Sequence, residues 1–408
     1  MIYYSVNNKQ FSNDVLFEDR IGYYIVNGKK YDNKWDAMEL ATSLNVDYTW
    51  HYAPEIFDKI DWSVPIEKSL DDLYVIRLQQ LRNHYDHMIL FFSGGKDSLN
   101  ILMTALNNNI LIDEIVVYYP FAMEKLFNNK EENSDNLYSE VEYAAKPILK
   151  SLESRMDRRT KIRFQDIGET TKRFYADPNW HDNIRPANTL QMVSPSNGGA
   201  YDDELIRLAL QGKNVCVITG ADKPSVVELD GSYYFKFMDA SFNSIPRPRS
   251  KEMKSQYSFI HYEPFYQTPF LPELVIKQAQ VIAAACDCDE NLRNLQNYKP
   301  IRSGTPNDKD KISEMTNVVV SEKERILATY LYSDGIQPWQ TRKHKKELYR
   351  RGELVVWETM DNTLRDNYMN GLKSVVKKID PKFFVGYDYV LGPRPMFTKP
   401  YYIKKTSY

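Results

Sequence analysis

The strongest hydrophobic pattern of the chain spans residues 88–106 and predicts a strand followed by a helix. Residues 88–92 are five consecutive apolar residues with polar residues on both sides. A short run of this kind is typical of a strand that is buried on both faces of a parallel sheet. Further on, apolar residues recur at helical spacing, at Leu99, Leu102, Met103 and Leu106. We therefore expect a helix that packs on the sheet.

Later segments repeat this alternation of strand and helix. Residues 112–119 are rich in β-branched and aromatic side chains, and with the preceding unit they predict a right-handed strand–helix–strand motif. A weaker strand is expected at 161–167. A helical pattern over 202–210 precedes a buried strand over 215–219. The pattern therefore predicts an α/β fold built on a parallel sheet.

Segments on either side of this core carry different patterns. Asn27-Gly28 separates two short β-rich runs and predicts a hairpin with a type I′ turn. Residues 1–66 are expected to form a small α+β unit. Residues 300–408 begin with a linker and are expected to form a helical C-terminal region whose last part, from residue 380, is extended. The candidate helices of that region span residues 321–332, 339–351 and 359–378.

Composition and charge exclude several classes of protein. The chain has 408 residues, enough for two or three domains with a large core. Charged residues make up 26% of it and the formal net charge is −2, so the chain as a whole is marked neither as disordered nor as nucleic-acid binding. Three cysteines cannot form a disulfide framework, and the sequence shows neither a secretory signal nor a membrane-spanning run. We expect a cytoplasmic protein that does not associate with membranes.

The turn between the first strand and its helix concentrates the chemistry of the chain. Its sequence, residues 93–98, is Ser-Gly-Gly-Lys-Asp-Ser. Two glycines let backbone N–H groups approach a ligand closely, and the helix that begins here favours anions at its N-terminus. Ser93 and Ser98 add hydroxyl groups, Lys96 adds a positive charge, and Asp97 is suited to hold a metal ion. We interpret the turn as a phosphate-binding loop; the alternative is a glycine-rich turn without a ligand.

The spacing differs from a Walker A loop, which needs four residues between its glycines, and from the three-glycine dinucleotide fingerprint. The hexapeptide resembles the PP-loop of the N-type ATP pyrophosphatases, the adenine nucleotide α-hydrolase-like superfamily, which includes asparagine synthetases. The resemblance is strongest over 72–119 and weaker over 202–224. It implies a Rossmann-like sheet with helices on both faces, of the HUP/PP-loop type, over residues 67–299. It also implies that ATP binds at Phe92, Ser93, Gly94, Gly95, Lys96, Asp97 and Ser98.

The same resemblance assigns roles beyond the loop. In the resembled family, the strand after the PP-loop helix contacts adenine through its backbone, which matches Val117 or Tyr118. The asparagine synthetase branch has a glycine-rich acidic turn whose aspartate binds the magnesium of the leaving pyrophosphate. Asp222 is the match in this chain, with Thr219 and Gly220 near the nucleotide. The turn is shorter than the family pattern and lacks its additional glutamates.

The activity that the resemblance implies is ATP-dependent adenylation. Enzymes of this superfamily cut ATP between its α and β phosphates, so the expected protein is a ligase-like synthetase that adenylates a carboxylate or amide oxygen and releases pyrophosphate. Ammonia, an amine or another nucleophile then attacks the adenylated carbon. Asp97 and Asp222 would hold Mg²⁺, and the catalytic residues would be Lys96, which neutralises phosphate charge, and Asp97. Because no cysteine precedes Cys216, a glutaminase domain is not expected.

Two other functions stay open. One is a PP-loop enzyme that modifies RNA, DNA or a nucleotide by thiolation, amidation or sulfonucleotide reduction; the lysine in the loop favours it, and the near-neutral charge and the lack of paired cysteines oppose it. The other is an ATP-binding module without catalysis. A small or macromolecular acceptor is expected at the loop-rich residues 168–200, unless these form only a surface excursion. The basic run 341–351 would close on the triphosphate, contact nucleic-acid phosphates or form a solvated helix face.

Overall fold

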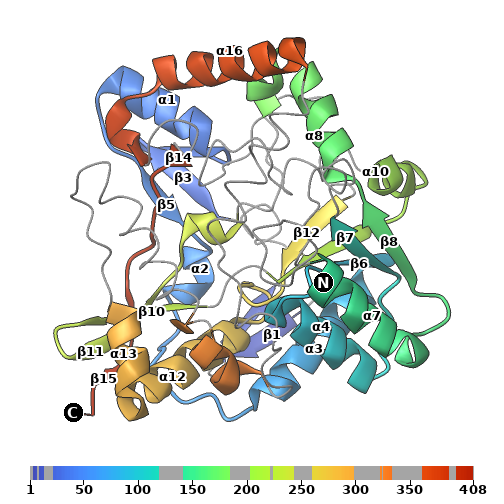
Figure 1. Ribbon diagram of the computed structural model, residues 1–408. Helices are drawn as coiled ribbons and strands as arrows, with labels where there is room; N and C mark the ends of the chain where they lie inside the picture. Colours follow the sequence, from blue (N-terminus) through green and yellow to red (C-terminus); the bar gives the residue numbers. More distant parts are fainter. Residues whose placement is uncertain are drawn as a thin grey trace.

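The computed structural model of the protein describes most of the chain (Figure 1). The described residues are 3–6, 9–12, 22–118, 141–183, 203–220, 224–242, 260–297, 322–323, 325–332, 361–385 and 392–407. Buried apolar side chains between Tyr24 and Ile403 form one hydrophobic core across these ranges. No helix within them is both long and apolar enough to cross a membrane.

A five-stranded parallel sheet lies at the centre of the fold. Its strands are β6 (His87–Phe91), β7 (Glu114–Tyr118), β8 (Lys161–Gln165), β9 (Val215–Thr219) and β12 (Ile260–Pro264). Their spatial order is β12-β9-β6-β7-β8, so β6, the first of them in the chain, lies in the middle. Numbered along the chain, this is the order 3-2-1-4-5 of Rossmann-like doubly wound folds. The α/β class and the four strands expected from the sequence are confirmed.

Helices cover this sheet from both sides (Figure 1). α3 (Leu70–His84) and α4 (Lys96–Asn107) pack on each other and on β6, and α12 (Pro272–Cys288) packs on α3. α7 (Lys146–Leu152) lies on the same side as α4 in Figure 1. α10 (Asp203–Leu210) contacts β9 and β12 from the other side. The connection from β8 to β9, which carries α10, crosses the sheet in the direction opposite to the connections from β6 to β7 and from β7 to β8, so right-handed crossovers place its helix on the opposite face.

The N-terminal part contains the hairpin that the sequence predicts, followed by two helices and a third strand. Its elements are β3 (Tyr23–Val26), β4 (Lys29–Tyr31), α1 (Lys34–Leu44), β5 (Thr49–His51) and α2 (Pro54–Phe57). Asn27 and Gly28 join β3 to β4 with φ angles of 46° and 75°, as a type I′ turn requires. Asn33 caps α1, since its side chain accepts the N–H of Trp35.

The C-terminal strand returns to this part of the fold. β15 (Tyr401–Lys405) pairs with β11 (Ser232–Lys236), which also pairs with β10 (Ser225–Leu229). Trp62 stacks on Tyr401 with 4.7 Å between ring centroids. Strands from two regions and an aromatic side chain from a third thus share one hydrophobic cluster, in which aromatic packing adds to the burial of apolar area.

A buried ion pair also links the N-terminal part, the segment after β11 and the segment before β15. Lys34 Nζ lies 2.6 Å from Asp239 Oδ2, and the two side chains are 3% and 2% exposed. The Tyr24 hydroxyl donates to the same carboxylate, and Lys34 also donates to the carbonyl oxygen of Arg394. Every charge here has a partner, which is the condition under which burial of charged groups is tolerated.

A second helical layer covers the far end of the molecule (Figure 1). α16 (Asn362–Lys378), which matches the helix expected at 359–378, packs on α8 (Ile167–Ala176). A Cβ at Gly371 of α16 would lie 2.3 Å from the indole nitrogen of Trp180, so glycine is needed for this approach. The remaining elements are β1 (Tyr3–Val6), β2 (Lys9–Ser12), η2 (Val141–Ala145), η3 (Glu153–Arg155), η4 (Trp180–Asn183), η6 (Asp239–Phe242), α13 (Glu290–Asn297), η8 (Pro381–Phe383), β13 (Phe384–Val385) and β14 (Gly392–Pro393).

One more buried ion pair ties α3 to the edge strand β12. Arg77 Nη2 lies 2.7 Å from Glu263 Oε2, and both side chains are 2% exposed. The Tyr85 hydroxyl donates to the other carboxylate oxygen. Removal of one member of such a pair leaves the other charge buried without compensation.

We therefore predict that Arg77→Met lowers the free energy of unfolding by about 3–5 kcal/mol. Urea denaturation of the full chain measures it. The control is Lys68→Met, which breaks the exposed ion pair of Lys68 with Glu273 and is expected to cost less than about 1 kcal/mol. A loss of less than about 1 kcal/mol for Arg77→Met would show that the buried pair is not a stabilising link.

Candidate functional site

The candidate site lies at the carboxyl edge of the sheet, between β6 and β9. After β6 the chain continues to β7 on one side, and after β9 it continues to β12 on the other side. The two connections therefore leave the neighbouring strands in opposite directions. Open α/β sheets bind ligands at such a switch point. The loop 92–95 leaves β6 here and enters α4, and Gly220 follows β9.

The structure brings the two predicted loops into contact at this point. A Cβ at Gly220 would lie 3.2 Å from the backbone nitrogen of Ser98 and 3.3 Å from Cβ of Asp97. The backbone after β9 therefore packs directly against the first turn of α4. The loop at 93–98 and the residues Thr219 and Gly220, which lie more than a hundred positions apart in the sequence, are thereby brought together.

Gly94 gives the loop its shape. Its φ of +76° is in the left-handed region, and a Cβ there would lie 2.6 Å from the backbone nitrogen of Ala145 in η2. Any other residue would be strained by both the backbone angle and the contact. The loop is thus pressed against a neighbouring helical turn with no room for a side chain at this position.

Two serine hydroxyls brace the loop from inside. Ser93 Oγ accepts the N–H of Gly95 at 3.1 Å, and Ser98 Oγ donates to the carbonyl oxygen of Gly95 at 3.0 Å. Ser98 Oγ also accepts the N–H of Ser93 at 3.4 Å. Ser98 is buried and Ser93 is exposed, so Ser93 is the serine of the loop that faces solvent.

The first turn of α4 offers a binding place for an anion. The N-cap residue of this helix is Gly95, which has no side chain to cap it, and the 12-residue helix carries a partial positive charge at this end. Lys96, which is 8% exposed, adds a full charge in a place where water screens it little. A bound phosphate would interact favourably with both charges.

Asp97 is held by two tyrosines from later parts of the chain. The Tyr266 hydroxyl donates to the Asp97 carbonyl oxygen at 2.7 Å, and the Tyr332 hydroxyl donates to Asp97 Oδ1 at 2.5 Å. Asn100 donates in turn to the Tyr266 hydroxyl at 3.1 Å. Burial, and after it the charge of Asp97, raises the pKa of both tyrosines, so each is a neutral O–H donor at neutral pH.

These tyrosines are the residues of the site that the sequence did not reveal. They lie 169 and 235 positions from Asp97, and neither belongs to a recognisable motif. The high tyrosine content, 30 of 408 residues, was the only signal, and it does not point to particular positions.

Thr219 presents a buried polar atom at the same edge. The residue is 4% exposed, and its Oγ1 has no hydrogen-bond partner among the described residues. A buried hydroxyl without a partner costs roughly 1–3 kcal/mol. A polar group of a ligand at the switch point would satisfy it.

The backbones of Phe92 and Val117 lie at the same carboxyl edge of the sheet. Phe92 donates its N–H to the carbonyl oxygen of Val116 at 2.9 Å, and its side chain is buried. The register of β6 with β7 ends at Phe91 and Val116, so Val117 is the first residue of β7 beyond it. The Val117 side chain is buried in the core, whereas Tyr118 is half-buried and packs its ring against Phe91. This arrangement is compatible with the expected backbone contact to adenine.

Asp222, the second predicted metal ligand, lies outside the described residues, as do 184–200 and the basic run 341–351. Within the described ranges no cluster of three or more His, Cys, Asp or Glu side chains could hold a metal ion. Mg²⁺ does not need such a cluster, because it is commonly bound by one or two carboxylates together with substrate phosphates.

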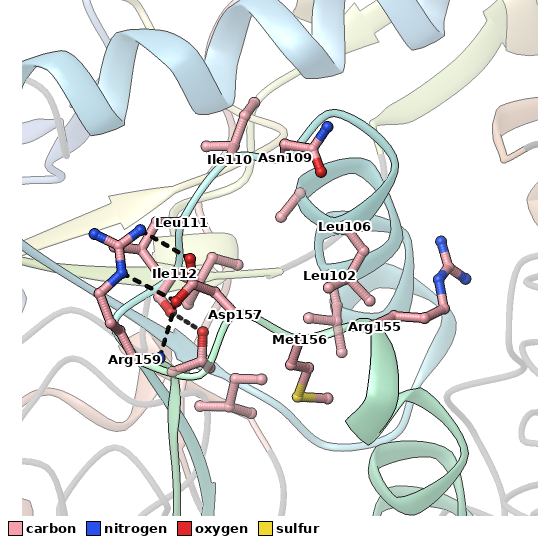
Figure 2. A pocket seen from close by; sticks show the side chains of 13 residues that line it. Leu102, Leu106, Asn109, Ile110, Leu111, Ile112, Arg155, Met156, Asp157 and Arg159 are labelled. Atoms are coloured by element: carbon pink, nitrogen blue, oxygen red, sulfur yellow. Dashed lines mark hydrogen bonds and ion pairs between the residues drawn. The ribbon is translucent and has the colours of Figure 1, made fainter.

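A separate cavity of about 190 Å³ lies at the opposite end of α4 (Figure 2). Leu102, Leu106 and Ile112 contribute to its apolar lining, and the ion pair of Asp157 with Arg159 lies at its margin. Hydrogen bonds from Arg159 lower the pKa of Asp157 to about 2. The cavity is at the amino edge of the sheet and shares no residue with the loop 93–98.

Comparison with known proteins gives no relative: no protein-family model matches the chain, and no curated protein matches it. We therefore assign the site from the hexapeptide motif and from the geometry of the loop.

We predict that Gly94→Ala destabilises the protein by at least about 2 kcal/mol, because it adds backbone strain and a backbone clash, and that it weakens ATP binding more than tenfold. Thermal unfolding and calorimetric titration measure the two effects. Gly212→Ala is the matched control: it has the same φ of +76° but nothing within 4 Å of the added Cβ. Equal losses of stability for the two variants, with ATP affinity unchanged in both, would contradict the assignment.

Thr219→Val is expected to weaken ATP binding by about 10–100-fold while leaving stability unchanged or raised by about 1 kcal/mol, because it removes a buried hydroxyl that has no partner in the part of the chain that the structure describes. The control is Thr104→Val, which removes a hydroxyl that donates to the Asn100 carbonyl oxygen, and which should cost about 1 kcal/mol without changing ATP affinity. Calorimetry and urea denaturation separate the two outcomes. A stability loss with intact affinity for Thr219→Val would assign that hydroxyl a structural role.

Proposed function

We propose that the protein binds Mg-ATP at residues 93–98 and cleaves it between the α and β phosphates, as an ATP-dependent synthetase of the PP-loop superfamily. The observation that carries this proposal is the contact of Gly220 with the first turn of α4. It joins a glycine-rich anion-binding loop to a second loop at the switch point of a Rossmann-like sheet. The motif alone suggests a phosphate-binding loop at 93–98. The contact supports a site that two loops form together.

The residues present fit a magnesium nucleotide. Gly94 and Gly220 let the two loops pack closely on η2 and on the first turn of α4, and the buried Thr219 hydroxyl has no partner among the described residues. Asp97 supplies a carboxylate, the ligand type that Mg²⁺ prefers. Asp97, together with Asp222, would hold the ion, which would neutralise phosphate charge when bound.

The residues of this chain would act mainly by positioning and electrostatics. The N–H groups in the first turn of α4 would bind the β and γ phosphates, and Lys96 would stabilise the charge that builds up on departing pyrophosphate. A carboxylate or amide oxygen of the acceptor would form a bond to the α phosphorus as the bond from that phosphorus to the bridging oxygen breaks. Attack by ammonia, an amine or another nucleophile on the adenylated carbon would then release AMP.

We predict that incubation with α-labelled ATP, Mg²⁺ and fractionated cell extract yields AMP and pyrophosphate, and that Asp97→Asn lowers this rate by about 100-fold, or about 2.7 kcal/mol of barrier. Chromatography of the labelled products measures it. Asp157→Asn is the control, because it changes an exposed aspartate at the other end of α4. Its rate should equal that of the unchanged protein.

Other products would indicate a different function. ADP and phosphate, formed at a rate that Asp97→Asn also removes, would contradict cleavage between the α and β phosphates. ATP affinity without turnover in any fraction would indicate a binding module. Activity that depends on RNA or DNA in the fraction, and weakens steeply with salt, would indicate a nucleic-acid-modifying enzyme.

A further inference from the structure

Tyr332 links the C-terminal third of the chain to the phosphate loop. It follows directly on the helical residues 325–331, is 7% exposed, and donates its hydroxyl to Asp97 Oδ1. Its ring packs against the rings of Tyr266 and Tyr74, at centroid distances of 5.7 Å and 6.3 Å. The hydroxyl is therefore held on the carboxylate by side chains from two other parts of the fold.

The segment that carries Tyr332 has a second anchor nearby. The Tyr74 hydroxyl, from α3, donates to the carbonyl oxygen of Leu331 at 3.0 Å. Two adjacent residues are thus fixed, one by its backbone to α3 and one by its side chain to Asp97. The docking of residues 325–332 and the contact of Tyr332 with the carboxylate can therefore be changed separately, by removing one hydrogen bond or the other.

We propose that Tyr332 is a positioning residue that orients the Asp97 carboxylate for the divalent cation of a bound nucleotide, so that residues 325–332 complete the metal site. The inference deepens the proposed function and rests on it. Residues that hydrogen-bond to a metal ligand fix its orientation, and their loss commonly costs 10–100-fold in metal affinity. An ionised carboxylate has about four lone-pair sites, so a hydrogen bond to Oδ1 is compatible with cation binding.

A competing account is that the hydroxyl only blocks Asp97 until a nucleotide displaces it. The two accounts predict opposite effects when the hydroxyl is removed. An orienting hydroxyl strengthens cation binding, so its loss weakens binding. A blocking hydroxyl competes with the cation, so its loss tightens binding.

The experiment is a titration of the full-length protein with Mn²⁺ in the presence of α,β-methylene-ATP, with bound Mn²⁺ measured by electron paramagnetic resonance. Tyr332→Phe keeps the ring and removes the hydroxyl, and it should weaken Mn²⁺ binding by at least tenfold. Tyr74→Phe removes the hydroxyl that holds Leu331 and should change Mn²⁺ binding by less than about threefold. Thermal unfolding of each variant establishes that it is folded.

Unchanged or tighter Mn²⁺ binding by Tyr332→Phe would overturn the inference while leaving the proposed function intact. An equal loss in Tyr74→Phe would also overturn it, because docking of the segment rather than the contact with Asp97 would then be responsible. If the unchanged protein binds no Mn²⁺ with the analogue, the proposed function itself fails, and this inference fails with it.

Discussion

The close approach of Gly220 to the first turn of α4 is the contact on which the candidate site depends. It exists because β6 and β9 are neighbouring strands. The loops that follow them start side by side at the carboxyl edge of the sheet before the chain turns in opposite directions. A Cβ at Gly220 would press on the backbone at Ser98, and a Cβ at Gly94 would press on Ala145. Backbone surfaces therefore make the site, and side chains at Lys96, Asp97 and Thr219 add charge and polarity at its margin.

Long-range contacts connect this site to the rest of the molecule. Tyr332 reaches Asp97 from the C-terminal third, and β15 pairs with β11, where Tyr401 stacks on Trp62. The buried pairs of Lys34 with Asp239 and of Arg77 with Glu263 join further segments across the fold. Because each buried charge needs its partner, these segments are held in defined positions relative to the sheet.

Local signals predicted much of the fold and part of the site. The apolar run before Ser93, the helical spacing after it and the Asn27-Gly28 turn each depend on neighbouring residues, and each is found where it was expected. The contacts of Tyr266 and Tyr332 with Asp97 could not be predicted, because they join positions 169 and 235 residues apart and no local pattern encodes them. The same holds for the pairing of β15 with β11.

The most direct test of the account is a crystal structure of the full chain with Mg²⁺ and α,β-methylene-ATP. We expect the β and γ phosphates on the backbone of residues 93–98, beside Thr219 and Gly220, with the adenine at the edge of β7. An analogue bound elsewhere, or phosphates that avoid the first turn of α4, would contradict the assignment of this loop as the ATP site.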